Sequence, residues 1–297
     1  MALRDFGLLV LVCLVWASNN IVSKYVVSHL GLPPLFYAAV RFGLVAAATL
    51  PWLWPMPRPR WRLIVVALLM GGGNFALLFV GLKTSTPSAA AVISQLGVPM
   101  TTLLSMGMLG EKIHWRRALG IGLTFAGALA VMYDPKGFSI SQGLLYVVAA
   151  AFAGSLGAVM MKQIEGVKPL QFQAWVGFAS FWPLAILSAV LEPGQLGQGL
   201  SAGWPFFAAV LYSGLVVSVG AHTIYYFLIG HYEANLISPL TLMTPLATIA
   251  LGVAIFHDPF GVRMAIGTII ALSGVLIIGL RGNQVMPLLL AIRNRAQ

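Results

Sequence analysis

Charged side chains are scarce in this sequence, and this scarcity limits the class of protein that it can encode. Only 8% of the 297 residues are charged, whereas a soluble globular domain carries about 25%. Hydrophobic residues make up 59% of the chain, and the mean hydropathy is +0.92. The shortage of charge excludes a soluble domain and predicts that most of the chain lies in lipid.

Cysteine and the usual signatures of catalysis are also missing. Cys13 is the one cysteine and lies within an apolar run, which excludes a disulfide and a thiolate metal site. The sequence has no paired-carboxylate site, no His-x-x-x-His spacing and no phosphate-binding glycine loop followed by Lys-Ser or Lys-Thr. We therefore predict a protein that is not an enzyme and that holds no metal and no cofactor.

Acidic residues number only seven, and each maps to a terminus or a predicted loop. They are Asp5, Glu111, Asp134, Glu165, Glu192, Glu233 and Asp258. Proton-coupled membrane proteins commonly use a carboxylate within the membrane as the proton carrier. The sequence predicts that no such carboxylate is present.

Long apolar runs are abundant. Each of ten runs reaches the length of about 20 residues that a helix needs to cross a bilayer. They predict an all-α membrane protein with ten transmembrane helices, near residues 6–27, 35–54, 62–82, 88–108, 115–133, 141–163, 171–191, 205–229, 235–255 and 263–281.

Basic residues form short clusters between these runs, which points to membrane topology rather than to a nucleic-acid partner. If the N-terminus is inside, twelve basic residues face the cytoplasm and five face outward. Because positive residues stay inside, both termini are predicted to be cytoplasmic. The first run has no small-x-small cleavage site, so we expect a helix rather than a signal peptide. The outward set is Lys24, Arg41, Lys83, Lys136 and Arg263.

Residues 87–133 and 233–281 read as variants of one another. They predict two repeats, 1–137 and 138–297, each with five helices, and an odd number of helices inverts the second repeat. Inverted repeats recur in secondary transporters, whose halves exchange conformations around a central site. Duplicated scaffolds and channels are the alternative. The shared features are Pro99 and Pro245 in mid-span, and glycines seven residues apart, Gly120 with Gly127 and Gly267 with Gly274.

The order of the motifs resembles a ten-helix exporter of the drug/metabolite transporter superfamily, with two EamA-type repeats. The likeness covers residues 5 to 281 and rests on Trp-Ala-Ser-Asn-Asn at 16–20, Gly-Glu-Lys at 110–112 and the paired glycines. Within the superfamily the chain is most similar to the YddG-type exporters of aromatic and other amino acids. The resemblance implies a central cavity between the halves. Asp258-Pro259 stands where many members carry Gly-Glu.

Polar residues recur along one face of the first run. Trp16, Asn20 and Lys24 are spaced by four residues, and lipid offers such groups no hydrogen-bond partners, so this face is expected to meet protein or water. Helical rise places Asn20 within about 5 Å of the midplane. Lys24 lies farther out, and it either binds a substrate carboxylate or extends its ammonium group toward the headgroups.

The two mid-span prolines suggest further polar positions. A proline donates no hydrogen bond, so the carbonyls of Gln95 and Thr241, four residues earlier, are predicted to be free beside their polar side chains. The alternative is that the prolines only kink the helices. The four paired glycines are expected to serve close helix packing.

Four more side chains are candidates for substrate contact. An ionisable residue within a span is a functional candidate by default, although a neutral imidazole that joins helices fits equally well. The others are an asparagine beside three glycines, a tyrosine and a tryptophan that offers a stacking surface. These candidates are His222, Asn74, Tyr225 and Trp175.

Together these features predict a secondary transporter, in a bacterial inner membrane, that exports small amphiphilic metabolites, amino acids above all, by alternating access. The partners are substrate and membrane lipid, and the protein is a monomer or a homodimer. Downhill facilitated export is favoured because no buried carboxylate is expected. Phosphorylated or nucleotide-linked sugars are rival substrates, but they require two or more cavity cations. A scaffold or receptor without flux is the rival from another class.

Overall fold

The structure is a computed structural model that describes residues 1–110, 114–134, 139–164, 166–232, 237 and 240–279. Seven helical stretches in these residues are long and apolar enough to cross a membrane, as judged by length and composition. They are Leu3–His29, Arg60–Thr84, Pro87–Leu109, Gln142–Met161, Pro169–Leu191, Trp204–Ile229 and Val262–Gly279. Two apolar helices are shorter, Pro34–Ala48 and Met243–Phe256.

The individual helices follow the predicted apolar runs. Residues 1–132 form α1 (Leu3–Lys24), α2 (Pro34–Ala48), α3 (Arg60–Leu68), α4 (Asn74–Thr84), α5 (Pro87–Ser94), α6 (Gly97–Leu109) and α7 (Trp115–Met132). Later residues form α8 (Gln142–Met161), α9 (Pro169–Leu191), α10 (Gln195–Ser201), α11 (Trp204–Leu211), α12 (His222–His231), α14 (Met243–Phe256) and α15 (Val262–Gly279).

Two local features differ from the predicted spans. The span predicted at 35–54 is not one helix, because α2 ends at Ala48 and a 3₁₀ turn covers Leu50–Leu53. Pro51 lies in that turn and has no N–H with which to continue an α-helix. A short antiparallel ribbon also joins β1 (Tyr133–Asp134) to β2 (Ser139–Ile140).

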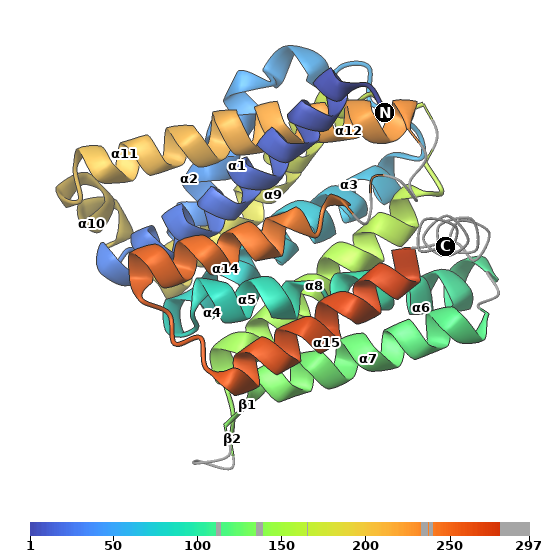
Figure 1. The fold of residues 1–297 in the computed structure, drawn as a ribbon. Coiled ribbons are helices and arrows are strands. Elements are labelled where there is room, and N and C mark those ends of the chain that lie inside the picture. Colours follow the sequence, from blue (N-terminus) through green and yellow to red (C-terminus); the bar gives the residue numbers. More distant parts are fainter. Residues whose placement is uncertain (111–113, 135–138, 165, 233–236, 238–239, 280–297) are drawn as a thin grey trace, which may run out of the picture.

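The helices lie side by side in one bundle (Figure 1). The start of α1 and the end of α15 lie at the same end of the bundle, on the right of the view, while α10 lies at the opposite end. Tyr232, which follows α12, accepts a hydrogen bond from the backbone N–H of Ala2 and donates one to Asp5. These contacts join the beginning of the chain to the end of α12.

Most residues of α2 are buried, and this helix packs against α9 and α4. Its largest fully buried side chains are Tyr37, Arg41 and Phe42. Arg41, which the sequence assigned to the outward-facing basic residues, is 0% exposed and lies within α2 rather than in a loop.

The two mid-span prolines interrupt their spans in the same way, but they free no carbonyl. The carbonyl of Gln95 accepts the N–H of Val98, and that of Thr241 accepts the N–H of Thr244, at 3.1 and 2.9 Å. In both cases the residue just before the proline supplies the donor. The predicted free backbone acceptors are thus absent at Gln95 and Thr241, because a tighter i to i+3 turn replaces the lost bond.

Two π-helical segments position polar residues in mid-span. Leu69–Gly73 joins α3 to α4 and ends directly before Asn74, while Tyr212–Ala221 joins α11 to α12 and ends directly before His222. A third, Tyr25–His29, continues α1. π-helical turns often occur at functional sites, because the extra residue redirects the side chains that follow. Asn74 and His222 each begin the α-helix after such a turn.

The paired glycines form the crossing of α7 and α15. A Cβ added at Gly127 would lie 2.4 Å from the backbone nitrogen of Ala271 and 2.5 Å from the carbonyl oxygen of Gly267. A Cβ at Gly120 would lie 2.7 Å from the carbonyl oxygen of Gly274. Backbone atoms cannot move aside as a flexible side chain can, so this crossing requires glycine.

We expect Gly127→Ala to destabilise the protein by about 1–3 kcal/mol, the usual cost of overpacking. Gly122→Ala on the same helix is the matched control, because a Cβ there meets nothing within 4 Å. Thermal unfolding of the detergent-solubilised variants measures the difference. Equal melting temperatures for the two variants would contradict the close α7–α15 crossing.

Candidate functional site

A cavity of about 390 Å³ lies inside the bundle. Its polar wall comes from helices far apart in the sequence, because α1, α4, α5, α6, α8 and α12 all contribute. The lining residues are Trp16, Asn19, Asn20, Asn74, Phe75, Leu78, Ser94, Gly97, Thr101, Ala150, Ala151, Gly154, Ser155, Val217 and His222.

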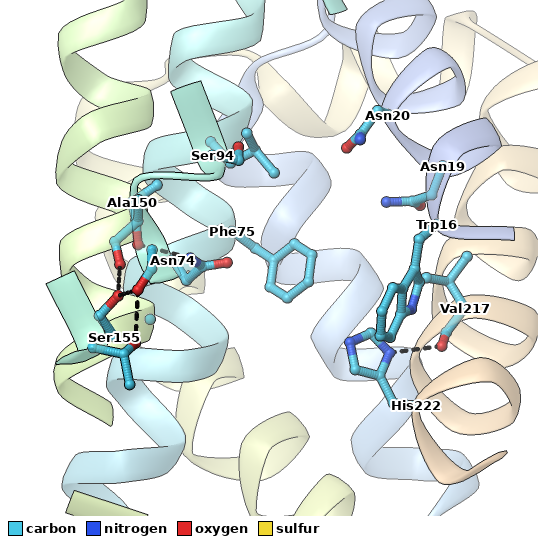
Figure 2. Close-up of a pocket in the computed structure, with 15 residues that line it drawn as sticks. Trp16, Asn19, Asn20, Asn74, Phe75, Ser94, Ala150, Ser155, Val217 and His222 are labelled. Atoms are coloured by element: carbon cyan, nitrogen blue, oxygen red, sulfur yellow. Dashed lines mark hydrogen bonds between the residues drawn. The ribbon is translucent and has the colours of Figure 1, made fainter. Parts of the chain in front are cut away.

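Two pairs of polar side chains lie on opposite sides of the Phe75 ring (Figure 2). Asn74 and Ser155 lie on one side of the ring, and Asn20 and His222 lie on the other. A molecule between them would meet hydrogen-bonding groups at both ends and an aromatic ring in the middle. That pattern suits a small compound with both polar and apolar parts.

Asn74 is held in place by α8. Its side-chain amide donates to the carbonyl oxygen of Ala150 at 2.7 Å. Gly154 leaves room for this contact, since a Cβ there would lie 2.8 Å from the amide nitrogen of Asn74. Ser155 donates to the carbonyl oxygens of Gly97 and Ala151. One wall of the cavity is therefore a set of fixed polar groups shared by α4, α6 and α8.

α1 supplies the opposite wall. The amide of Asn20 contacts the hydroxyl oxygen of Thr248 on α14 at 3.4 Å, a long hydrogen bond. Neighbouring Asn19 is buried, and its Oδ1 atom has no hydrogen-bond partner among the described residues. An unpaired amide oxygen beside a cavity is available to accept a hydrogen bond from a ligand or from water.

His222 closes the site on the α12 side. Its Nδ1 atom lies 2.8 Å from the carbonyl oxygen of Val217, so Nδ1 carries a proton and donates it to that oxygen. The imidazole packs against Trp16, with ring centroids 5.2 Å apart, and lies 6.5 Å from the ring of Phe75. His222 therefore has a defined orientation in an aromatic cluster.

A second cavity, of about 270 Å³, adjoins the first. Five residues line both cavities: Trp16, Asn74, Phe75, Gly154 and His222. The second cavity adds residues of α2 and α9 and four further aromatic side chains, Phe42, Phe172, Tyr225 and Tyr226. Its other lining residues are Met70, Gln173, Val176 and Ser218. The shared residues form the boundary between the two spaces.

Four of the eight predicted substrate-contact residues thus lie together, since Asn20, Asn74 and His222 line the first cavity and Tyr225 lines the second. The other four, Lys24, Gln95, Trp175 and Thr241, are absent from both linings. Propensity and spacing place polar residues on helices, but they do not say how each helix is rotated in the bundle.

Lys24 and Trp175 make structural contacts elsewhere. Lys24 Nζ donates to the carbonyl oxygen of Leu82 at 2.8 Å, which ties α1 to the end of α4. The indole N–H of Trp175 donates to the carbonyl oxygen of Leu53 at 3.2 Å, next to the end of α2. Each contact uses a polar group to hold the end of a neighbouring helix.

Several site residues were not evident from the sequence. Ser94, Thr101 and Ser155 line the cavity but are ordinary polar residues within apolar runs. Phe75 looks like any core aromatic. Arg41 had a usable signal, because an arginine in mid-span is itself a functional candidate.

Asp258 maps to a loop, as the sequence predicts, and there the protein encloses its side chain. It lies in the loop after α14 but is only 6% exposed, and its Oδ2 atom accepts from the backbone N–H and the hydroxyl of Ser88 at 3.0 and 2.5 Å. His257, at φ +52°, turns the chain back so that this contact forms. A carboxylate at the first turn of α5 caps the free N–H groups of that helix.

The described residues contain no group of three or more His, Cys, Asp or Glu side chains that could hold a metal ion. Glu111, Glu165 and Glu233, and the side chain of Asp134, lie outside the part of the chain that the structure describes in this detail.

A helical bundle of membrane-crossing length around an internal polar cavity is the architecture of a membrane transporter. The sequence pattern of the EamA-like transporter family matches residues 6–133 and again residues 141–280. The chain belongs to this family, which confirms the resemblance drawn from its motifs, and it is therefore a multi-pass membrane protein.

Two similar proteins carry the name "Probable amino-acid metabolite efflux pump". The one from Escherichia coli (strain K12) is 26% identical over 93% of this chain and 95% of its own length. The one from Salmonella typhimurium is also 26% identical over 93% of this chain. "Uncharacterized transporter YvbV" of Bacillus subtilis is 22% identical over 99% of this chain and 97% of its own length.

A solved crystal structure shares the fold. It has a TM-score of 0.61 and 20% sequence identity, and the alignment covers 93% of this chain and 96% of the other. The arrangement of helices described above is thus one that an experimental structure also adopts.

We expect Asp258→Ala to lower the stability of the protein by about 0.5–2 kcal/mol, because it removes the acceptor of the Ser88 N–H in the first turn of α5. Asp258→Asn keeps an acceptor oxygen and should retain most of the stability. Thermal unfolding in detergent compares the two variants. A stable Asp258→Asn variant that had lost transport driven by a pH gradient would show that the carboxylate carries protons rather than caps a helix.

Proposed function

We propose that this protein exports small amphiphilic metabolites, amino acids above all, across the bacterial inner membrane. The observation that carries the proposal is the cavity of about 390 Å³, whose wall combines Asn20 and Asn74 from one half of the chain with Ser155 and His222 from the other. A site shared between halves is the requirement for alternating access, because each half must contact the substrate as the two move.

The same proposal includes ten transmembrane spans in two inverted halves. Seven long spans and two shorter apolar helices are present, and α7, with 18 residues, supplies the tenth. Five of these fall within residues 1–137 and five within 138–297, which agrees with the two family matches. An even total returns the chain to its starting side, so both termini are cytoplasmic if one is.

The cavity lining favours an amino acid as cargo. Amide and hydroxyl groups at Asn20, Asn74 and Ser155 offer donors and acceptors to a zwitterion, while Trp16 and Phe75 offer apolar surface to its side chain. The volume lies in the range of about 300–1,000 Å³ that small-molecule sites occupy. The relatives named as amino-acid metabolite efflux pumps support the same substrate class.

Facilitated export down a concentration gradient remains the mechanism that we propose. The one buried carboxylate among the described residues, Asp258, is engaged in capping α5 and lines neither cavity. The halves would exchange between open states by rocking, and the proline turns before α14 and within the α5–α6 span would absorb the bending.

Doubly anionic sugar phosphates fit the site less well. No lysine or arginine is among the residues that line the two cavities, and a compound with two negative charges would need two or more such partners. A scaffold without flux leaves unexplained why amide, hydroxyl and imidazole groups from both halves of the chain line one cavity.

Liposomes that contain the purified protein and are loaded with labelled amino acids are expected to release them faster than loaded liposomes without the protein. Unlabelled amino acid in excess should slow the release, because a carrier saturates. Saturable binding with no flux would instead favour a receptor or scaffold. A panel of amino acids, amines and sugar phosphates in the same vesicles tests the substrate class.

Removing polar groups from the cavity should lower efflux while the fold survives. We expect Asn20→Leu, Asn74→Leu and His222→Leu each to reduce the initial rate about tenfold or more, since a hydrogen bond to a charged group contributes about 1.5–3 kcal/mol. Gln95→Leu is the matched control, because Gln95 lies on a neighbouring span outside both linings. Normal transport by all three cavity variants would contradict the site.

A further inference from the structure

Arg41 is a positive charge buried in the middle of a membrane protein. It lies on α2 and is 0% exposed, the largest fully buried side chain of the described residues. An arginine buried away from water is costly unless each of its donors is paired and its charge is balanced. Its partners therefore indicate what the charge is for.

The described residues satisfy only part of the guanidinium group. Nε and Nη2 donate to the hydroxyl oxygen of Ser218, at 3.2 and 2.9 Å. Nη1 is buried and has no hydrogen-bond partner among the described residues. No described carboxylate lies within ion-pair distance, so the charge is balanced only by the faces of aromatic rings.

Phe75 covers the group. The guanidinium carbon lies 4.1 Å from the centre of the Phe75 ring and 5.8 Å from those of Phe42 and Phe79. A cation above an aromatic face is attracted by the ring's electron density, which stabilises the charge in the absence of an anion. This arrangement stabilises the charge while the Nη1 donor stays unpaired.

The group lies one side chain behind the wall of the substrate cavities. Ser218, Phe42 and Phe75 all line the second cavity, and Phe75 also lines the first. Arg41 contacts all three of these residues. Phe75 both stacks on the guanidinium group and lines the two cavities, so a movement of its ring would open the group toward their shared boundary.

We infer that Arg41 binds the carboxylate of the substrate during transport, after Phe75 moves aside. Guanidinium groups pair with carboxylates through two parallel hydrogen bonds, and Nη1 is the free half of such a pair. The inference rests on the proposed function and assigns to Arg41 the role that the sequence suggested for Lys24. It also predicts that the carboxylate, more than the amino group, selects the cargo.

Matched substrates with and without a carboxylate test the inference. The probes are phenylalanine and phenylalaninamide, which differ only in whether that end of the molecule carries a negative charge. In wild-type liposomes we expect faster efflux of phenylalanine. Arg41→Gln should slow phenylalanine about tenfold or more, by the loss of a charged hydrogen bond, and change phenylalaninamide less than about threefold.

Two further variants complete the experiment. Arg263→Gln is the control, because it removes an exposed arginine at the start of α15 and should leave both rates unchanged. Arg41→Lys keeps the positive charge without the planar fork, and it should show an intermediate loss for phenylalanine alone. If Arg41→Gln does not fold, the substrate dependence of Arg41→Lys decides the question.

The carboxylate role would be overturned if Arg41→Gln slowed the efflux of both probes equally, or slowed the efflux of neither. Flux of neither probe through the wild type would instead overturn the proposed function. In that case, stabilisation of the detergent-solubilised protein by each probe still tests the site. A carboxylate site is supported if phenylalanine, but not its amide, raises the melting temperature of the wild type and neither raises that of Arg41→Gln. Equal rises in the two proteins contradict such a site.

Discussion

The absence of hydrogen-bond partners in lipid is the constraint on which this structure depends. A polar group within a spanning helix must find its partner inside the protein, so each one marks either a helix contact or a water-filled space. Both outcomes occur here. Lys24 and Trp175 bond to the carbonyls of neighbouring helix ends, whereas Asn20 and His222 turn toward a cavity. The same constraint explains the proline turns, in which a nearby amide replaces the lost donor.

Close packing and open space are distributed between different helices of the bundle. The α7–α15 crossing brings backbones together through glycine, and it lies apart from the polar cavity. The cavity is instead bounded by helices whose regular geometry is interrupted. π-helical turns before Asn74 and His222 and the break between α5 and α6 bring side chains inward. Irregular backbone at membrane depth is tolerated where it lines such a space.

Charge inside the bundle is handled in two ways. Asp258 is paired at a helix start, where the backbone dipoles favour a negative group. Arg41 has no such anion among the described residues and lies against aromatic rings beside the cavities. A fully paired charge is a structural element, whereas a partly paired one retains the capacity to bind. This difference separates the cap of α5 from the residue that we assign to the substrate.

The sequence by itself determined the membrane class, the apolar runs and the family, because hydropathy and the spacing of motifs are local properties of the chain. It also identified Asn20, Asn74 and His222, since any amide or imidazole deep in a span is unusual. Only the tertiary structure decided which side chains share a space. Gln95 and Asn20 look equivalent in sequence, but the rotation of each helix about its axis, set by packing with its neighbours, placed only Asn20 on the cavity wall. The same packing buried Arg41 against its neighbours, which its place in a predicted span does not reveal.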